Sequence, residues 1–79
     1  MRCVTIRLNL TKNLNQFVNI VNRFPYEMNL RSGRHVRDAK SLLGIFTLDL
    51  KQPLILEIHH DKCEKLLEEL SPFIETGIA

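Results

Sequence analysis

Apolar and polar residues alternate at the start of the chain. The apolar ones in this stretch are Val4, Ile6, Leu8 and Leu10. Successive side chains of a strand point to opposite faces, so this period of two predicts a strand over residues 2–10 with one buried face. The next apolar residues recur at spacings of three and four, which predicts an amphipathic helix that runs to about residue 23: Leu14, Phe17, Val18, Val21 and Phe24.

The ends of this helix have their own signals. Thr11 or Asn13 can cap its start by accepting a hydrogen bond from a free backbone N–H group, and Asn13 with Gln16 imitates a capping box. Pro25 cannot continue a helix, and it drives the preceding Phe24 toward extended geometry. We therefore expect the helix to end just before this pair.

Two strands and a tight turn are expected next. Residues 26–31 alternate again, with apolar side chains at every second position. Ser32-Gly33 is expected to turn the chain, because glycine supplies the positive φ that tight hairpins need. Residues 34–39 form a third strand with few apolar side chains, so we place this strand at a sheet edge, where its arginines discourage edge-to-edge pairing.

The second half of the chain predicts a short helix, a central strand and a last helix. Ser41 opens the short helix, which ends near Thr47, and the near-continuous apolar run over 54–59 indicates a central strand. Asp61 is expected to cap the last helix, with Glu64 completing a capping box. Six residues form the apolar stripe of that helix: Cys63, Leu66, Leu67, Leu70, Phe73 and Ile74.

The predicted order of elements is β-α-β-β-α-β-α. Each strand has one apolar face and each helix is amphipathic, so the economical arrangement is an α+β fold in which helices cover one face of a four-stranded antiparallel sheet. The other face of the sheet stays in contact with water. At 79 residues the chain is expected to form a single domain over 1–79.

Composition excludes several classes of function. Charged residues make up 25% of the chain and the net charge is only +2, so nucleic acid is not the expected partner. Cys3 and Cys63 are too few and too far apart for a disulfide framework or a zinc site, which suits a reducing compartment. Because Arg2 and Arg7 interrupt the N-terminal segment and no apolar run reaches about 18 residues, we expect no membrane insertion and a soluble, cytoplasmic protein.

The three histidines predict no metal centre. His59 and His60 end a strand, where adjacent side chains point to opposite faces, so both cannot bind one ion without distortion. His35 belongs to the predicted edge strand. We expect solvated imidazoles, with no metal and no cofactor.

One segment carries a family resemblance. Residues 39–44 read Ala-Lys-Ser-Leu-Leu-Gly and match, position by position, the segment A-K-S-[IL]-[ML]-G. That segment opens the short second helix of HPr, the histidine-containing phosphocarrier family of the bacterial sugar phosphotransferase system. The element order of nearly the whole chain is similar to that of HPr as well. The resemblance implies an HPr-like open-faced β-sandwich with three helices.

The phosphocarrier motif of that family is absent. Its first helix begins with G-[IL]-H-A-R-P-A, whose histidine takes a phosphoryl group from enzyme I and passes it to sugar permease components. Residues 9–14 here read Asn-Leu-Thr-Lys-Asn-Leu, so Lys12 replaces the arginine, Asn13 replaces the proline, and no histidine is present. Phosphohistidine chemistry needs an imidazole nucleophile. We therefore predict that the carrier reaction is lost and that the protein is not an enzyme.

The resemblance implies a different site at Ser41. In Gram-positive bacteria an ATP-dependent kinase phosphorylates the serine that opens this helix, and the modified HPr acts as a corepressor in carbon catabolite control. By this resemblance Ser41 is a regulatory phosphorylation site. The implied partners are an HPr kinase-like enzyme and a transcription regulator or phosphotransferase components. The implied partner interface consists of Lys40, Leu42, Leu43 and Phe46.

Several alternatives stay open at this point. Ser41 can be a helix cap alone, and Leu42, Leu43 and Phe46 can simply cover the sheet. One of the three histidines can serve as a displaced phosphoryl acceptor. The β-α-β-β order also fits a ferredoxin-like RNA-binding module, but its strands offer only Tyr26 for base stacking. A basic cluster around the third strand is either a solvated edge or a contact for an acidic partner: Arg31, Arg34, Arg37 and Lys40.

Overall fold

The computed structural model describes residues 1–9 and 13–75. Three sequence predictions lie outside the described residues. They are the end of the first strand at Leu10, the helix cap at Thr11 and the replacement of the family's arginine by Lys12. The elements are β1 (Arg2–Ile6), α1 (Leu14–Asn22), β2 (Met28–Ser32), β3 (His35–Asp38), α2 (Leu42–Ile45), β4 (Leu54–Ile58), α3 (Glu64–Leu70) and the 3₁₀ turn η1 (Ser71–Phe73).

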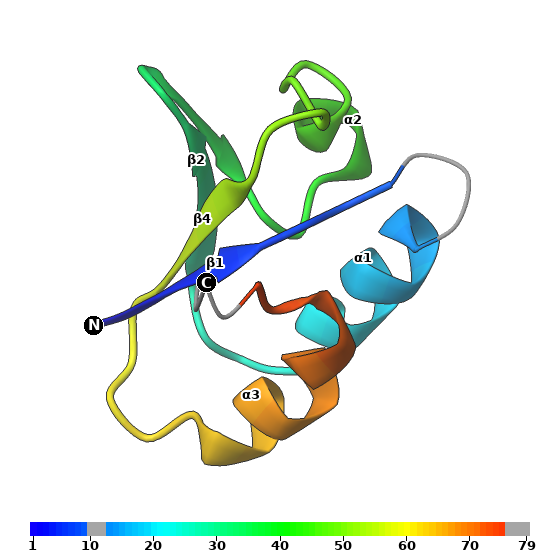
Figure 1. Cartoon of the computed structure of the whole chain (residues 1–79). Coiled ribbons are helices and arrows are strands. Elements are labelled where there is room, and N and C mark those ends of the chain that lie inside the picture. Colours follow the sequence, from blue (N-terminus) through cyan, green and yellow to red (C-terminus); the bar gives the residue numbers. More distant parts are fainter. Residues whose placement is uncertain (10–12, 76–79) are drawn as a thin grey trace.

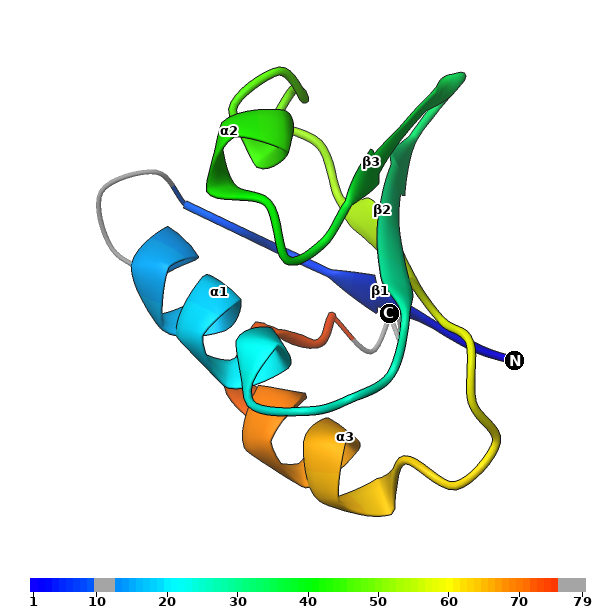
Figure 2. The ribbon, with the colours of Figure 1, turned by 180° about the vertical axis from the view of Figure 1, so that it is seen from behind.

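The four strands form one antiparallel sheet in the order β1-β4-β2-β3. The apolar strand β4 is central, with Leu56 opposite Val4 on one side and Leu30 on the other, and the polar strand β3 lies at the edge. Helices α1, α2 and α3 lie on one side of the sheet (Figures 1 and 2). The predicted α+β fold, with its helices on one face of a four-stranded antiparallel sheet, is confirmed.

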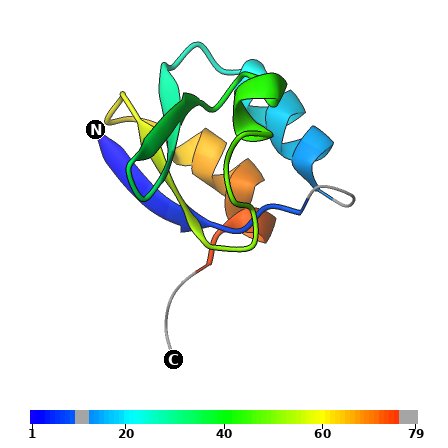
Figure 3. The ribbon, with the colours of Figure 1, turned by 90° about the horizontal axis from the view of Figure 1, so that it is seen from above.

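The core lies between this face of the sheet and the helices. Helices α1 and α3 run side by side across it (Figures 1 and 3). Phe17 of α1 is fully buried, and its ring meets that of Phe73 edge to face, with the two centroids 6.0 Å apart. The strands and the last helix contribute further side chains with 0% exposure: Ile6, Leu30, Leu54, Leu56, Ile58, Leu66 and Leu70.

The other face of the sheet consists of two rows of side chains that cross the strands. One row runs through Thr5, Ile55, Arg31 and Val36, which the register places opposite one another. In the neighbouring row, Glu57 accepts a hydrogen bond from Nε of Arg31 at 2.9 Å. This face is mixed and mostly polar, as expected for the side of an antiparallel sheet that stays in water.

The first strand is shorter than predicted. It ends at Ile6, because its partner β4 begins at Leu54, the residue opposite Ile6, and offers no further pairing. The N–H of Arg7 instead donates to the carbonyl of Phe73 at 2.9 Å. Leu8 nevertheless stays in the core at 4% exposure. The second strand also starts late, at Met28, so the Tyr26 expected within it precedes the strand.

Both predicted capping boxes are wrong. Asn13 is the N-cap residue of α1, but its side chain makes no cap bond, since its Oδ1 accepts from the N–H of Asn9 at 2.6 Å. Helix α3 begins at Glu64 after the N-cap residue Cys63, three positions beyond Asp61. Asp61 instead accepts a hydrogen bond from the terminal ammonium group of Met1 at 2.7 Å, and this bond lowers the pKa of the Asp61 carboxyl.

The hairpin turn is one residue later than predicted. Ser32 pairs with His35 across β2 and β3, so the two loop residues are Gly33 and Arg34. Gly33 has a φ of +59°, in the left-handed region that L-residues enter only at a cost. The sequence identified the glycine correctly and misplaced the turn around it.

Replacing Gly33 by alanine is expected to lower the free energy of unfolding by about 1 kcal/mol. An added Cβ would meet no atom within 4 Å, so the cost arises from the positive φ alone. Gly44→Ala in α2 is the control, because alanine favours helices and its Cβ would make ordinary contacts at 3.4–3.6 Å. Urea denaturation followed by circular dichroism measures both. Equal stability of Gly33→Ala and the parent would contradict the hairpin geometry.

Candidate functional site

Ser41 caps the short helix α2, as predicted. Its backbone is extended, and its Oγ accepts a hydrogen bond from the N–H of Gly44 at 3.1 Å. The helix ends at Ile45, two residues before the predicted end, and the N–H of Thr47 then donates to the carbonyl of Gly44. The hydroxyl oxygen of Ser41 is therefore held at the start of α2 by a backbone donor of the same turn.

Two large apolar side chains beside this serine are exposed. Leu43 is 79% exposed and Phe46 is 52% exposed. Phe46 is the C-cap residue of α2 and follows Leu43 by three positions, so the two side chains lie on the same side of this turn. We call these two residues the α2 patch. The alternative that these residues cover the sheet is wrong for Leu43 and Phe46. Leu42 is partly buried against the core, and Ile45 is fully buried.

Lys40 connects the start of α2 to the end of α1. Its Nζ donates to the carbonyl of Phe24 at 2.6 Å, and its own carbonyl accepts from Nδ2 of Asn22 at 3.3 Å. Its backbone N–H donates to Oδ1 of Asp38 at 2.9 Å. The ammonium group predicted to be part of a partner interface is thus already engaged within the chain, where it positions the segment before Ser41.

Arg37 and Thr47 fix the other end of α2, and sequence reasoning missed this pair. Nε of Arg37 donates to Oγ1 of Thr47 at 2.8 Å, and the Thr47 hydroxyl donates to the carbonyl of Gly44 at 2.6 Å. The two residues are ten positions apart and belong to different elements. Only the placement of α2 beside β3 brings them together, so no local sequence signal predicted the contact (Figure 2).

The three histidines are exposed and lie apart from α2. His35 starts β3 at the hairpin, while His59 and His60 follow β4 at the end of the sheet away from α2 (Figure 1). Nε2 of His59 lies 3.1 Å from Nδ2 of Asn29, and Nδ1 of His60 accepts from the N–H of Lys62 at 3.0 Å. Within residues 1–9 and 13–75, no three His, Cys, Asp or Glu side chains are grouped so that they could hold a metal ion.

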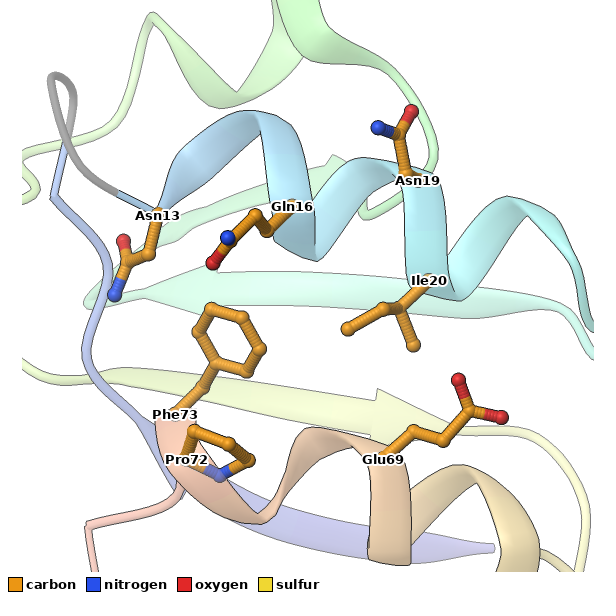
Figure 4. Close-up of a pocket in the computed structure, with 7 residues that line it drawn as sticks. All are labelled: Asn13, Gln16, Asn19, Ile20, Glu69, Pro72 and Phe73. Atoms are coloured by element: carbon orange, nitrogen blue, oxygen red, sulfur yellow. The ribbon is translucent and has the colours of Figure 1, made fainter.

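Two hollows lie near the helices. An open groove of about 420 Å³ runs between α1 and the α3–η1 segment, and Figure 4 displays the seven side chains that line it. Most of the α1 residues in this groove carry amides, and Glu69 on the opposite wall pairs with Arg23. A second hollow of about 630 Å³ lies between residues 7–9 and the segment 48–51 that follows α2.

Solved structures of known proteins have the same arrangement of strands and helices. HPr-C-His from Thermoanaerobacter tengcongensis matches with a TM-score of 0.74 and 24% sequence identity, over 91% of this chain and 89% of that chain. The chain has the HPr fold. Phosphocarrier protein HPr from Bacillus anthracis str. Ames also has this fold, with a TM-score of 0.67, 22% identity and 94% coverage of both chains.

The HPr fold is retained here with little sequence in common. A histidine-containing phosphocarrier protein from mycoplasma matches with a TM-score of 0.67 at only 5% identity, over 90% of this chain and 86% of that chain. No protein-family model and no curated protein sequence matches the chain. None of the helices in the described part of the chain is long and apolar enough to cross a membrane.

Removal of the Ser41 cap is expected to cost stability. Ser41→Ala leaves the N–H of Gly44 without its acceptor and should lower the free energy of unfolding by about 1 kcal/mol. Ser41→Asn is the matched variant, because asparagine caps helices as well as serine does but offers no hydroxyl group. We expect Ser41→Asn to stay within a few tenths of a kcal/mol of the parent in urea denaturation. Equal losses in both variants would contradict the capping role.

Proposed function

We propose that this protein is a non-catalytic interaction module of the HPr type, with Ser41 as a regulatory phosphoryl acceptor and the α2 patch as its docking surface. The observation that carries the proposal is the position of a capping hydroxyl next to two large exposed apolar side chains, Leu43 and Phe46. A globular protein gains nothing for its own stability from such side chains in water. Their exposure supports a role in binding.

The geometry of Ser41 supports phosphorylation by a kinase. Its Oγ acts as the acceptor for Gly44, so its own proton can be directed toward a base of the kinase. In the proposed step, Oγ forms a bond to the γ-phosphorus of ATP while the bond between that phosphorus and ADP breaks. The serine proton passes to the kinase base. The product adds about −1.5 to −2 charges next to the α2 patch, which changes what this surface can bind.

Phosphoryl transfer through a histidine gains no support from the described residues. The segment over 9–14, which corresponds to the family motif, contains no histidine. His59 and His60 lie at the other end of the sheet, and each already has a ring nitrogen close to another nitrogen of the chain. We therefore do not assign a phosphocarrier reaction to His35, His59 or His60.

The proposed partners are proteins of the phosphotransferase type. By resemblance they include an HPr kinase-like enzyme that uses ATP and a transcription regulator or phosphotransferase component that reads the phosphorylated surface. Such partners place the protein in the cytoplasm. RNA binding is disfavoured, because none of the four described strands contains a Phe, Tyr or Trp residue on which a base could stack.

The proposal is tested by incubating the protein with ATP and an HPr kinase and measuring its intact mass. We expect the parent protein to gain one phosphoryl group that is stable in acid. Ser41→Ala and Ser41→Asn should gain none, and Ser41→Asn separates loss of the hydroxyl from loss of the helix cap. A gain that persists in Ser41→Asn would contradict the assignment of Ser41.

A further inference from the structure

The open face of the sheet carries two large apolar side chains that contact water. Ile55 of β4 is 41% exposed and Val36 of β3 is 36% exposed. The register places both of them opposite Arg31 of β2, so the three residues form one row across the sheet. Helices α1, α2 and α3 all lie on the other face (Figures 1 and 2). This row is therefore open to a partner.

Four residues at the centre of this face form a block with opposite charges on one diagonal. Ile55 and Glu57 belong to β4, and Arg31 and Asn29 lie opposite them on β2. Side chains two positions apart on a strand point to the same face, so all four belong to the open face. Arg31 and Glu57 occupy one diagonal, where Nε and Oε2 are 2.9 Å apart. Ile55 and Asn29 occupy the other diagonal. The formal charges of this block cancel.

The block is complementary to a second copy of itself. A two-fold axis that lies in the interface along the Ile55–Asn29 diagonal exchanges the positions of Arg31 and Glu57. In two copies stacked face to face about this axis, Arg31 of each copy faces Glu57 of the other. Ile55 then meets Ile55, and Asn29 meets Asn29, whose amide group can both donate and accept a hydrogen bond. A symmetric dimer requires this kind of self-complementary surface.

We propose that the open face of the sheet is a dimer interface, in which two copies pack sheet against sheet about this axis. The inference does not depend on the proposed function, because α2 lies on the opposite face of the sheet (Figures 1 and 2). Dimerisation leaves the α2 patch of both copies uncovered. A dimer that presents two such patches would bind a two-fold symmetric partner with greater avidity than a monomer.

The size of the face predicts a weak and reversible dimer. Strands about 4.8 Å apart with about 3.3 Å per residue give this sheet an area of roughly 300 Å² in projection. A standard interface buries about 800 Å² on each partner. We therefore expect a dissociation constant on the order of 0.1 mM. The mixed composition of the face fits this expectation, since a non-obligate interface is about as polar as the rest of a protein surface.

Charge and chemistry favour a second copy over other occupants. Nucleic acid binds clustered positive charge, whereas the charges of the block cancel. A lipid surface needs a wide apolar area, and Glu57 lies beside Ile55 on the same strand. A second copy alone uses every residue of the block, because the two charges exchange places about the diagonal between them.

The test is sedimentation equilibrium of the parent protein between about 0.01 and 1 mM, a range that brackets the expected dissociation constant. We expect the mean mass to rise from 9.2 kDa toward twice this value. Arg31→Glu leaves the diagonal with two negative charges, and Glu57→Arg leaves it with two positive charges. Each variant should weaken self-association at least about tenfold, because both contacts between the copies become repulsive. Circular dichroism verifies that each variant is folded.

Mixing the two variants distinguishes an interface from a structural effect within one copy. In a dimer of one Arg31→Glu chain and one Glu57→Arg chain, every acidic group faces a basic group, so the mixture should associate about as strongly as the parent. Loss of the bond between Arg31 and Glu57 inside each chain predicts no such recovery. Lys65→Glu makes the same charge change as Arg31→Glu at an exposed site on α3, and it should leave self-association unchanged.

Three results would overturn the inference. The first is a parent protein that stays at 9.2 kDa over the whole range, which would leave the open face to a different protein. The second is self-association that persists unchanged in both charge variants, because the contact would then lie elsewhere. The third is a mixture of the two variants that stays monomeric. Phosphorylation of Ser41 is scored separately by mass, so either proposal can fail without the other.

Discussion

Replacing Phe17 by alanine is expected to lower the free energy of unfolding by about 3–5 kcal/mol. Phe17 is 0% exposed, and its ring packs edge to face against Phe73, so it joins α1 to the turn η1 that follows α3. The substitution removes a large apolar side chain and leaves a cavity that the packed core cannot fill. Small proteins have a total stability of about 5–15 kcal/mol, so this substitution removes a large part of it and should lower the midpoint of unfolding clearly.

Phe46→Ala is the matched control for this substitution. It removes the same side chain from a site that is 52% exposed, and we expect a loss of less than about 1 kcal/mol. Urea denaturation followed by circular dichroism gives both values. Similar losses at Phe17 and Phe46 would contradict the division between core and exposed patch on which the proposed docking surface depends.

Replacing Leu43 and Phe46 together by alanine is expected to slow phosphorylation of Ser41 by an HPr kinase by roughly a hundredfold in kcat/KM. Loss of one apolar anchor at an interface costs on the order of 1–2 kcal/mol, which corresponds to roughly tenfold for each side chain. Ser41 keeps its cap bond to Gly44 in this variant, so the effect reports docking of the kinase and not the state of the acceptor. Release of ADP under steady-state conditions provides the measurement.

Val36→Ala with Ile55→Ala is the control for the docking variant. These residues are 36% and 41% exposed and lie on the open face of the sheet, away from the helices. The control removes comparable apolar side chains from strands β3 and β4, and we expect its kcat/KM to equal that of the parent. An equal loss of rate in both double variants would contradict the assignment of kinase docking to the α2 patch.

The positions of the strands follow from sequence because each strand has a distinct pattern. The run over 54–59 is almost entirely apolar, which suits only a strand with neighbours on both sides, and β4 is indeed central. Strand β3 has few apolar side chains, which suits a strand with a neighbour on one side only, and β3 lies at the edge. The glycine of the hairpin was also identified, since a positive φ there admits few other residues.

Capping and exposure were harder to predict because they depend on partners far away in the sequence. Asp61 was predicted as a cap, but it pairs with the chain terminus, which β1 places beside it. Most residues of α2 are large and apolar, so its pattern cannot decide which side faces the core. The packing of α2 against β3 buries Ile45 and exposes Leu43. The contact between Arg37 and Thr47 likewise exists only in the folded chain.

The central claim is that this HPr fold accepts a phosphoryl group on Ser41 and has lost the transfer through histidine. The most direct test incubates the protein with ATP and an HPr kinase in one tube and with phosphoenolpyruvate and enzyme I in another, and then compares intact masses before and after acid treatment. We predict a gain of one acid-stable phosphoryl group in the first tube and no gain in the second. An acid-labile gain from phosphoenolpyruvate, with no acid-stable gain from ATP, would contradict the account.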